Sequence, residues 1–311
     1  MSAPFANIAV IGLGLLGGSV GLAVHEFLPG AVTTGHDLDP ANRARAATRG
    51  LVDTVCETAA DAVRKADLVI FCVPPGAMGD AARAIAGAVP AHAVISDVGS
   101  CKVAVAKALG EALPGHIAKG AVIPAHPVAG TENSGPDAGF ASLFRHRWCI
   151  VTPPADADPA LVEKVTAFWV ALGANVEIMD AAHHDLVLAV TSHLPHLIAY
   201  TIVGTASDLE DVTQSEVIKY SAGGFRDFTR IAASDPTMWR DVFLSNKDAV
   251  LEMLQRFSED LTALQRAIRV GDGEALFDQF TRTRAIRRSI IAEGQDDARP
   301  DFGRGDHGGA G

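Results

Sequence analysis

The first part of the chain alternates short β-branched runs with amphipathic stretches. Seven such runs, each bounded by Gly, Pro or polar residues, predict β-strands at Asn7–Ile11, Ala31–Asp37, Asp67–Val73, Ala93–Asp97, Gly120–Pro124, Trp148–Thr152 and Asn175–Met179. Because the stretches between them have helical patterns, the order predicts a parallel sheet with helices on both faces. One helix is marked at both ends, since Asp39 and Pro40 form an N-cap with a first-turn proline and Gly50 lies where a C-terminal cap is expected.

The pattern changes at about Asp180, where the strand signals stop. Beyond it, apolar residues recur at three- and four-residue spacing, for example at Val250, Leu254, Phe257, Leu261 and Leu264. Asp235 and Pro236 begin a further helix by the same capping logic, and Gly271–Gly273 predicts a turn between helices. We therefore expect an α/β domain at 1–180, an all-helical domain at 181–294 and a Gly- and Asp-rich disordered tail at 295–311.

The composition narrows the class of protein. The 311 residues are 48% hydrophobic and 20% charged, which excludes a disordered or fibrous protein. With 26 Lys and Arg against 37 Asp and Glu, the net charge of -11 opposes binding to nucleic acid. The four cysteines form no C-x-x-C pair, which favours free thiols in a reducing compartment.

One stretch, Leu186–Ala206, contains no Asp, Glu, Lys or Arg and is long enough to cross a bilayer. His193, Pro195 and His196 at its centre would be costly in lipid, so we interpret the stretch as a core helix beside a polar cavity. Residues 1–8 have no basic region ahead of the apolar run, which argues against a signal peptide. We therefore expect a cytoplasmic protein without a membrane partner.

The first predicted strand runs into a glycine-rich motif that opens a helix. The motif is G-x-G-x-x-G, and its first glycine permits a tight turn, the second admits a pyrophosphate close to the backbone, and the third lets helix pack on strand. The helix N-terminus then supplies amide donors to the phosphates. We therefore expect a dinucleotide here, with contacts from Gly12, Gly14, Leu15, Leu16, Gly17, Val73 and Pro74.

Asp37, 20 residues past Gly17 and at the end of the second strand, indicates which dinucleotide binds. Its carboxylate is placed to accept hydrogen bonds from the ribose hydroxyls of NAD and would repel a 2'-phosphate. The alternative that it only caps a helix is weaker, because Asp39 is better placed to do so. Arg43 and Arg45 keep NADP open as the alternative, since either could receive a 2'-phosphate.

Two loop segments at predicted strand ends carry candidate chemistry. In Ser96–Lys102, Ser100 is a candidate site residue that also fits an N-cap, and Lys102 could be a solvated first-turn residue. His126 follows the predicted strand Gly120–Pro124, so it is a candidate proton acceptor, although it could simply hydrogen-bond its loop.

The apolar helix carries the third candidate segment. His193 and His196 are three residues apart, so they should share a helix face. Zinc is one alternative, with His183–Asp185 nearby, but H-E-x-x-H and Cys ligands are missing, so no metal is expected. An anion site is favoured instead, because Arg226 and Arg230 follow and a guanidinium is the preferred partner of a carboxylate, although either arginine could pair with an acidic neighbour.

These segments together resemble the prephenate/arogenate (cyclohexadienyl) dehydrogenase family of tyrosine biosynthesis. The resemblance rests on G-L-G-L-L-G-G-S at Gly12–Ser19, D-V-G-S-C-K at Asp97–Lys102, H-P-V-A-G-T-E-N-S-G at His126–Gly135, S-H-L-P-H at Ser192–His196 and G-G-F-R-D-F-T-R-I-A-x-S-D-P-x-M-W-R-D at Gly223–Asp241. It implies a Rossmann-like α/β domain followed by an all-α dimerisation domain, and hence a homodimer. Cys101 departs from the small aliphatic residue that is usual at its position.

The resemblance also implies a reaction and roles for residues. NAD would take a hydride from the ring carbon that bears the hydroxyl, the ring carboxylate would leave as carbon dioxide, and the ring would become aromatic. By motif, His126 would deprotonate the hydroxyl, and Ser100 would orient it and the nicotinamide. Arg230 would bind a substrate carboxylate, His196 the side-chain carboxylate, and Glu132 would form a polar gate with the arginine. Further members of the substrate site would be His193, Thr131 and Trp239.

Two other functions fit the same domain plan. One is a β-hydroxyacid dehydrogenase or imine reductase, but those enzymes usually place a catalytic lysine or acid in the helical domain. The other is a non-catalytic NAD-binding protein, which would bind the cofactor without turnover. Within the resembled family, prephenate and arogenate stay open as substrates, and Thr131, neutral where an acid would favour the amine, favours prephenate or use of both.

Overall fold

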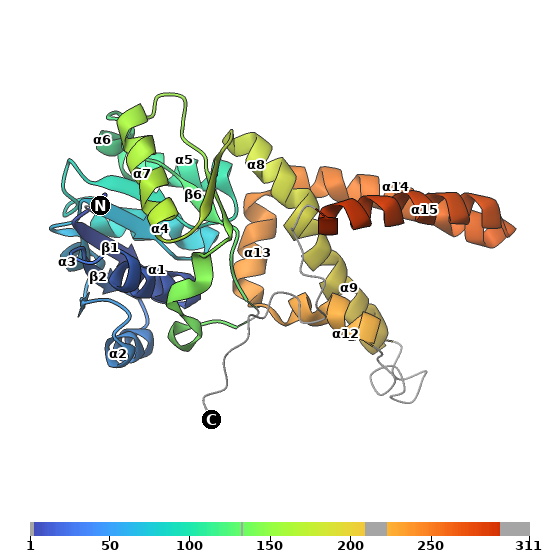
Figure 1. The fold of residues 1–311 in the computed structure, drawn as a ribbon, viewed down its shortest axis with the longest axis horizontal. Coiled ribbons are helices and arrows are strands. Elements are labelled where there is room, and N and C mark those ends of the chain that lie inside the picture. The colour runs from blue at the N-terminus through green and yellow to red at the C-terminus, as the bar shows by residue number, and fades with distance from the viewer. Residues whose placement is uncertain (1–2, 132, 209–222, 293–311) are drawn as a thin grey trace. The chain divides into compact units, whose positions relative to one another are not determined.

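The computed structural model describes residues 3–131, 133–208 and 223–292. The chain divides into two compact units, residues 1–253 and residues 254–311. Strands and helices alternate in the first part of the first unit, and the described residues after Ile178 are helical or irregular, as the sequence predicts. Figure 1 traces this order from the N-terminus onward.

Five strands of the first unit form a parallel sheet in the order β3-β2-β1-β4-β5. They are β1 (Asn7–Ile11), β2 (Val32–His36), β3 (Thr54–Val55), β4 (Leu68–Phe71) and β5 (Val94–Asp97). Four of them confirm predicted strands, whereas β3 has only 2 residues and is too short to show a pattern. The strand order reverses between β1 and β4, and open α/β sheets bind ligands at the carboxyl ends of the strands beside such a reversal.

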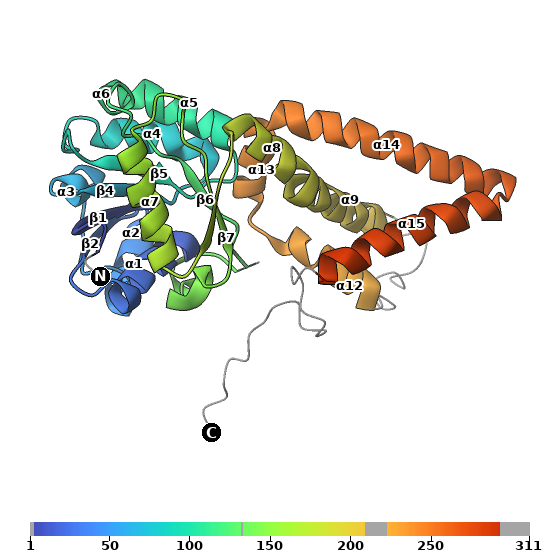
Figure 2. The ribbon, with the colours of Figure 1, turned by 45° about the horizontal axis from the view of Figure 1, so that its top comes forward.

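Both faces of this sheet are buried, and alternate side chains of a strand enter different cores. Val10 packs into the core that α1 (Leu15–Phe27) covers, and the next residue, Ile11, packs into the core beneath α4 (Met78–Ile85) and α5 (Lys102–Ala112). Figure 2 shows these helices on opposite faces of the sheet. The other helices of this α/β part are α2 (Pro40–Arg49), α3 (Ala59–Val63), α6 (Pro114–Ile117) and α7 (Pro159–Ala171).

The predicted caps of α2 are confirmed. The carboxylate of Asp39 accepts a hydrogen bond from Ala41 N at 2.8 Å, and Pro40 occupies the first turn. Gly50 closes the helix in the left-handed conformation with φ 61°, which a glycine adopts without strain.

A second, three-stranded sheet corrects the sequence prediction around His126. It contains β6 (Ala125–Pro127), β7 (Trp148–Val151) and β8 (Asn175–Ile178), and β6 runs antiparallel to β7. The predicted strand at 120–124 was wrong, because that segment forms only an isolated bridge between Val122 and Ile95. Pro124 has no N–H to continue along β5, so the chain turns to β7, and His126 lies inside a strand instead of after one.

The helical part of the first unit begins with one long helix interrupted by a π-helical turn. The pieces are α8 (Ala181–Leu188), the turn η4 (Ala189–His193) and α9 (Leu194–Asp208). The turn precedes Pro195, whose ring would clash with the carbonyl four residues earlier in a regular α-helix. Next come α12 (Gly223–Thr229), the 3-10 turn η5 (Arg230–Ala233) and α13 (Pro236–Ser245), which Asp235 caps through Met238 N as predicted.

The segment Ala181–Asp208 is long and apolar enough to cross a membrane, but only 22% of its most apolar window is buried within the chain. The expectation of a core helix was therefore wrong for the single chain. Val190, Ile202 and Val203 are among its exposed apolar side chains. An exposed apolar surface of this kind is typical of an interaction surface.

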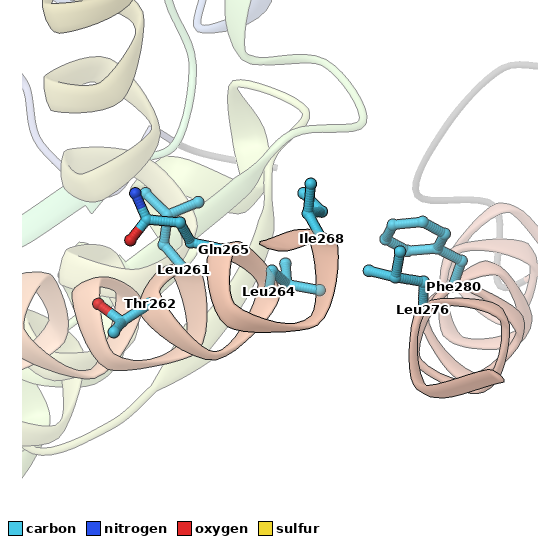
Figure 3. A pocket seen from close by; sticks show the side chains of 7 residues that line it. All are labelled: Leu261, Thr262, Leu264, Gln265, Ile268, Leu276 and Phe280. Atoms are coloured by element: carbon cyan, nitrogen blue, oxygen red, sulfur yellow. The ribbon is translucent and has the colours of Figure 1, made fainter. Parts of the chain in front are cut away.

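The second unit contains a hairpin of two helices. Helix α14 (Lys247–Val270) extends into it and is followed by α15 (Gly273–Ala292). Gly271, with φ 72°, forms the predicted turn between them. Apolar side chains of the two helices line an open groove, and Figure 3 shows Leu264 and Ile268 on one side of it and Leu276 and Phe280 on the other.

Candidate active site

The glycine-rich motif forms a tight loop after β1 that leaves room beside the backbone. Gly12 has φ 99° and donates its N–H to His36 O at 2.8 Å, which joins the loop to the end of β2. A Cβ on Gly17 would lie 1.8 Å from Gly12 O, whereas a Cβ on Gly14 would meet no atom within 4 Å. Gly17 is therefore required by packing, and Gly14 borders open space at the start of α1, where amide groups and the helix dipole favour an anion.

The carboxylate of Asp37 braces this loop. Its Oδ2 accepts a hydrogen bond from Leu13 N at 2.8 Å, and its Oδ1 accepts from Asp39 N at 3.0 Å and from the side chain of Asn42 at 3.1 Å. Each carboxylate oxygen offers two lone pairs, so Oδ2 keeps one for a ribose hydroxyl. The expected acidic residue thus stands at the end of β2 beside the glycine loop.

Arg43 and Arg45, the two arginines that could receive the 2'-phosphate of NADP, both have partners within the chain. Arg43 donates to the carbonyl oxygens of Asp37 and Leu38 and pairs with Glu57 at 2.9 Å. Arg45 pairs with Asp137. A 2'-phosphate would have to displace these contacts and would meet the carboxylate of Asp37, so the geometry favours NAD.

Lys102 is fully buried, so the alternative that it is a solvated first-turn residue was wrong. Its Nζ donates to Asp97 Oδ2 at 2.5 Å and to Ala125 O at 2.6 Å, which joins the ends of β5 and β6 next to His126. Burial raises the pKa of the Asp97 carboxyl, while the Lys102 ammonium and Gly99 N–H oppose the rise. A positive and a negative charge are thus held together in the interior because each is the other's main partner.

His126 is buried, at 8% exposure, and belongs to a chain of hydrogen bonds. Its Nδ1 lies 2.8 Å from Nε2 of His184, and Nδ1 of His184 lies 2.9 Å from Oδ1 of Asp185. The Asp185 carboxylate also accepts from Lys102 N at 2.7 Å and from Val103 N at 3.0 Å. It therefore caps α5 from a distant part of the chain. The alternative that Ser100 is the N-cap was wrong, because Cys101 occupies that position and its own side chain makes no capping hydrogen bond.

The buried histidines are neutral at physiological pH. Burial holds the pKa of His126 well below its usual value, and the positive charge of Lys102 lowers it further. Burial also lowers the pKa of His184, although the hydrogen bond that its ring donates to the Asp185 carboxylate opposes the shift. The same cause lowers the pKa of His193 to about 4. A neutral imidazole can accept a proton, as general base catalysis requires.

His193 and Trp239 each present a buried N–H group that has no hydrogen-bond partner among the described residues. The side-chain nitrogen of Asn246 donates to Asp185 O at 2.7 Å and lies 3.1 Å from Nδ1 of His193, so Nδ1 accepts and the hydrogen of His193 is on Nε2. Nε2 of His193 and Nε1 of Trp239 are both buried and unpaired. Because the two rings are in contact, with centroids 6.1 Å apart, the pair offers donors to an acceptor-bearing ligand.

His196 stacks on the other side of this aromatic cluster. Its ring lies 3.6 Å from the Trp239 ring, centroid to centroid, at an angle of 22°. Nδ1 donates to Ser192 O at 2.9 Å, which leaves Nε2 as its free atom. Burial lowers the pKa of His196, and the positive charge of Arg230 lowers it further, although the bond to Ser192 opposes the shift. Arg230 therefore places a positive charge near His196.

The structure brings most of the predicted site residues together and leaves others apart. His126, His193, His196, Trp239 and Arg230 form one connected neighbourhood through the contacts above. Ser100 is half-buried next to Cys101, which packs against Trp239 and Val242.

The remaining expected site residues fall in two groups. The predicted cofactor contacts Leu15 and Leu16 lie in the first turn of α1, and Val73 and Pro74 follow β4 at the same edge of the sheet. Thr131 is exposed, and Glu132 lies outside the described residues. Among the residues that the structure describes, no three His, Cys, Asp or Glu side chains form a cluster suited to a metal ion.

Sequence reasoning missed four residues of the site: Asp97, His184, Asp185 and Asn246. In the sequence, Asp97 stands out only as a member of a motif and Asp185 only as a possible zinc ligand, and no pattern marks Asn246. His184, Asp185 and Asn246 act across long stretches of chain, for example 58 residues between His126 and His184, whereas Asp97 pairs with Lys102 in the segment that follows it. One signal was available in the sequence: His184 and Asp185 are polar residues next to an apolar stretch without other charges. Because buried polar groups need partners, this position indicates that the two side chains form hydrogen bonds inside the protein.

Models of known families match nearly the whole described chain. Residues 20–178 match prephenate dehydrogenase, nucleotide-binding domain, and residues 180–282 match prephenate dehydrogenase, dimerization domain. A cyclohexadienyl dehydrogenase of Zymomonas mobilis is 43% identical over 92% of this chain and 96% of its own length. A prephenate dehydrogenase of Bacillus subtilis is 32% identical over 91% of this chain and 76% of its own length.

A solved structure shares both the fold and the sequence. It is the prephenate dehydrogenase of Aquifex aeolicus in complex with hydroxyphenyl propionate and NAD+, which is 30% identical with a TM-score of 0.84. The match covers 93% of this chain and 98% of the Aquifex chain. The likeness therefore extends over both the sheet and the helices described above.

Proposed function

The chain belongs to the prephenate dehydrogenase family, and from this premise we propose that it catalyses the NAD-dependent oxidative decarboxylation of prephenate to 4-hydroxyphenylpyruvate, with arogenate as a second candidate substrate. The reaction is a step of tyrosine biosynthesis. The observation that carries the proposal is a neutral, buried His126 in the same neighbourhood as two histidines and an arginine suited to a dicarboxylate.

The glycine loop and Asp37 are the residues that would hold NAD. The open space at Gly14 and the N-terminus of α1 suit the pyrophosphate, and the Asp37 carboxylate suits the ribose hydroxyls. Leu15, Leu16, Val73 and Pro74 border the same edge. When bound, the nicotinamide supplies the hydride acceptor for the ring carbon that bears the hydroxyl.

His126 is the base in this proposal. It takes the proton of the ring hydroxyl, and it returns that proton to the phenolate oxygen after carbon dioxide has left and the ring has become aromatic. Burial favours this role because it keeps the imidazole neutral and excludes competing water. Ser100, in the short segment between β5 and α5, orients the hydroxyl and the nicotinamide in this proposal.

The helical part binds the substrate. Arg230 holds one carboxylate and His196 the side-chain carboxylate, with the unpaired donors of His193 and Trp239 beside them. Because Nδ1 of His196 is committed to Ser192 O, its Nε2 donates to a carboxylate only when the ring is protonated. Substrate binding therefore draws a proton onto His196. Thr131 and Glu132 follow β6 in the sequence, and in this proposal Thr131 contacts the substrate and Glu132, which lies outside the described residues, forms a polar gate with Arg230.

We place the domain boundary near residue 180, with a cofactor domain at 1–180 and a substrate and dimerisation domain at 181–294. The active form is a homodimer. Support comes from the description of the matched 180–282 region as a dimerization domain and from exposed apolar side chains such as Ile202, Val203 and Phe280. A second copy covering the apolar helix also accounts for its composition without a membrane. We expect the enzyme in the cytoplasm and without a nucleic-acid partner, because the chain is acidic and its described cysteines are free.

The test is the initial rate of NADH formation by purified protein with prephenate or arogenate, each offered with NAD or NADP. We expect the highest kcat/KM with prephenate and NAD. Turnover with arogenate alone would reverse the substrate preference and keep the mechanism. Absence of turnover with both, in a protein that binds NAD, would refute the proposal in favour of a non-catalytic NAD-binding protein or another dehydrogenase.

The anion site is tested by matched arginine variants. Arg230→Ala should raise KM for prephenate by about 10- to 100-fold, because a charge-assisted hydrogen bond contributes about 1.5–3 kcal/mol. Arg226→Ala is the control, since that arginine is 79% exposed and pairs only loosely with Asp227 at 3.8 Å. Equal effects of the two substitutions would contradict the assignment of Arg230.

A further inference from the structure

Asp185 begins a chain of hydrogen bonds that runs through His184 and ends at His126, the proposed base. Its Oδ1 accepts from Lys102 N and its Oδ2 accepts from Val103 N, so both oxygens face groups that only donate. Oδ1 also faces His184 Nδ1 at 2.9 Å. Because this carboxylate acts as an acceptor to all its neighbours, the hydrogen of that contact belongs to Nδ1 of His184.

The position of that hydrogen determines the next one. His184 is neutral because burial lowers its pKa, so a hydrogen on Nδ1 leaves only a lone pair on Nε2. Nε2 lies 2.8 Å from Nδ1 of His126 and therefore accepts from it. His126, neutral for the same reason, then carries its hydrogen on Nδ1 and a bare lone pair on Nε2.

We propose that Asp185 and His184 are positioning residues that hold His126 in the tautomer whose Nε2 is free to take the substrate proton. The inference rests on the proposed function, in which His126 is the base. In the reaction the O–H bond of the ring hydroxyl breaks, the proton forms an N–H bond with Nε2, and the oxygen keeps the electron pair as the hydride leaves the carbon. The oxygen's electron pair forms the carbonyl bond, and the nicotinamide of NAD, which the proposed function supplies, would accept the hydride, so no reactant beyond NAD is needed.

The same chain stabilises the charge that the step creates. Protonation of Nε2 makes His126 a buried cation near the Lys102 ammonium, and both the burial and that positive charge oppose it. The hydrogen bond from Nδ1 to His184, backed by the carboxylate of Asp185, becomes charge-assisted at that moment and is roughly twice as strong. The cap on α5 keeps the carboxylate fixed, so it does not have to reorient during turnover.

The tautomer is measured directly by NMR of protein labelled with ¹⁵N-histidine, in long-range nitrogen-proton spectra of the ring nitrogens. A His126→Gln spectrum identifies the signals of His126. We expect His126 with hydrogen on Nδ1 and none on Nε2, and His184 in the same form. Hydrogen on Nε2 of His126 in the wild-type protein would overturn the proposal, whether or not the chain turns over prephenate.

Kinetic variants test whether the tautomer matters for turnover. In Asp185→Asn the amide can present a donor to His184, which reverses both tautomers and should lower kcat by about 10²- to 10⁴-fold with a smaller change in KM, as for carboxylate-to-amide changes behind other catalytic histidines. His184→Gln retains an oxygen that can accept from His126, so it should keep at least about tenfold more kcat than His184→Leu. His183→Gln, at the exposed neighbour, is the matched control and should change neither kcat nor the spectrum.

A purely structural role of Asp185 predicts a different result. If the carboxylate served only to cap α5, Asp185→Asn would lower the melting temperature but leave kcat per folded enzyme and the His126 tautomer unchanged. That result, or equal kcat in His184→Gln and His184→Leu, would overturn the proposal. Loss of turnover by the wild-type protein with every substrate would instead refute the proposed function, because the spectra are recorded without substrate.

Discussion

Replacing Lys102 by Met removes the positive charge of the buried pair while keeping an unbranched side chain of similar length. The ammonium of Lys102 is fully buried and donates to Asp97 and to Ala125 O, beside His126. In Lys102→Met the carboxylate of Asp97 stays buried without a counter-charge, and its Oδ1 already has no hydrogen-bond partner in the part of the chain that the structure describes. Breaking a buried pair by removing one partner costs about 3–5 kcal/mol, so the unfolding free energy should fall by that amount at pH 7.5.

The decrease in the unfolding free energy of Lys102→Met should become smaller at low pH. Burial raises the folded-state pKa of Asp97, and the loss of Lys102 removes the main opposing charge, so in the variant this pKa rises further above the unfolded value. A carboxyl whose pKa is higher in the folded state favours folding once it is protonated. The difference in unfolding free energy between wild type and Lys102→Met should therefore decrease as pH falls below the folded-state pKa of Asp97, by at most about 1.4 kcal/mol per pH unit.

The assay is urea unfolding followed by tryptophan fluorescence at pH 7.5 and pH 5.5. All 3 tryptophans lie in residues 1–253, so the signal reports on the unit that contains the pair. Lys107→Met, which removes a lysine that is 76% exposed on the same helix, is the control and should cost less than about 0.5 kcal/mol. The double variant Asp97→Asn/Lys102→Met removes both charges and should recover about 2 kcal/mol or more. A deficit below about 1 kcal/mol, no change with pH, or no recovery in the double variant would refute the reasoning.

Two further predictions concern the cofactor loop and the pH dependence of turnover. Gly17→Ala forces a Cβ to 1.8 Å from Gly12 O and should lower the melting temperature, whereas Gly14→Ala meets no protein atom and should fold normally but bind NAD more weakly, as circular dichroism and NAD titration can show. Because the pKa of His126 is lowered, kcat should stay constant near neutrality and fall only at acid pH well below 6.5, while KM for prephenate should rise with pH as His196 loses the proton that its carboxylate contact needs. A pH-independent KM would contradict the role of His196.

The parts of the fold that follow local rules were predictable. Gly12, Gly17 and Asp37 are identified by spacing alone, because a tight turn, a close helix-strand contact and a strand-end carboxylate each constrain one position. The caps of α2 and α13 follow from Asp-Pro pairs for the same reason.

The parts that depend on distant contacts were not predictable. Lys102 looks like a surface residue of a first helical turn, and only the convergence of Asp97 and Ala125 O makes its burial tolerable. The strand containing His126 was placed five residues too early, because the pattern of apolar residues marks burial and does not say which neighbour a strand pairs with. The hydrogen bond between His126 and His184 likewise joins two elements, β6 and α8, whose contact no periodicity in the sequence predicts.

The bond between Leu13 N and Asp37 restricts how cofactor preference could evolve in this chain. One carboxylate both shapes the glycine loop and repels a 2'-phosphate, so a substitution that admits the phosphate also removes the acceptor that Leu13 N uses. Arg43 would in addition have to leave Glu57 and the Asp37 carbonyl to reach the phosphate. A change of dinucleotide therefore requires coordinated substitutions, among them a neutral acceptor such as serine at position 37, and single-step mutational paths from NAD to NADP pass through weakened enzymes.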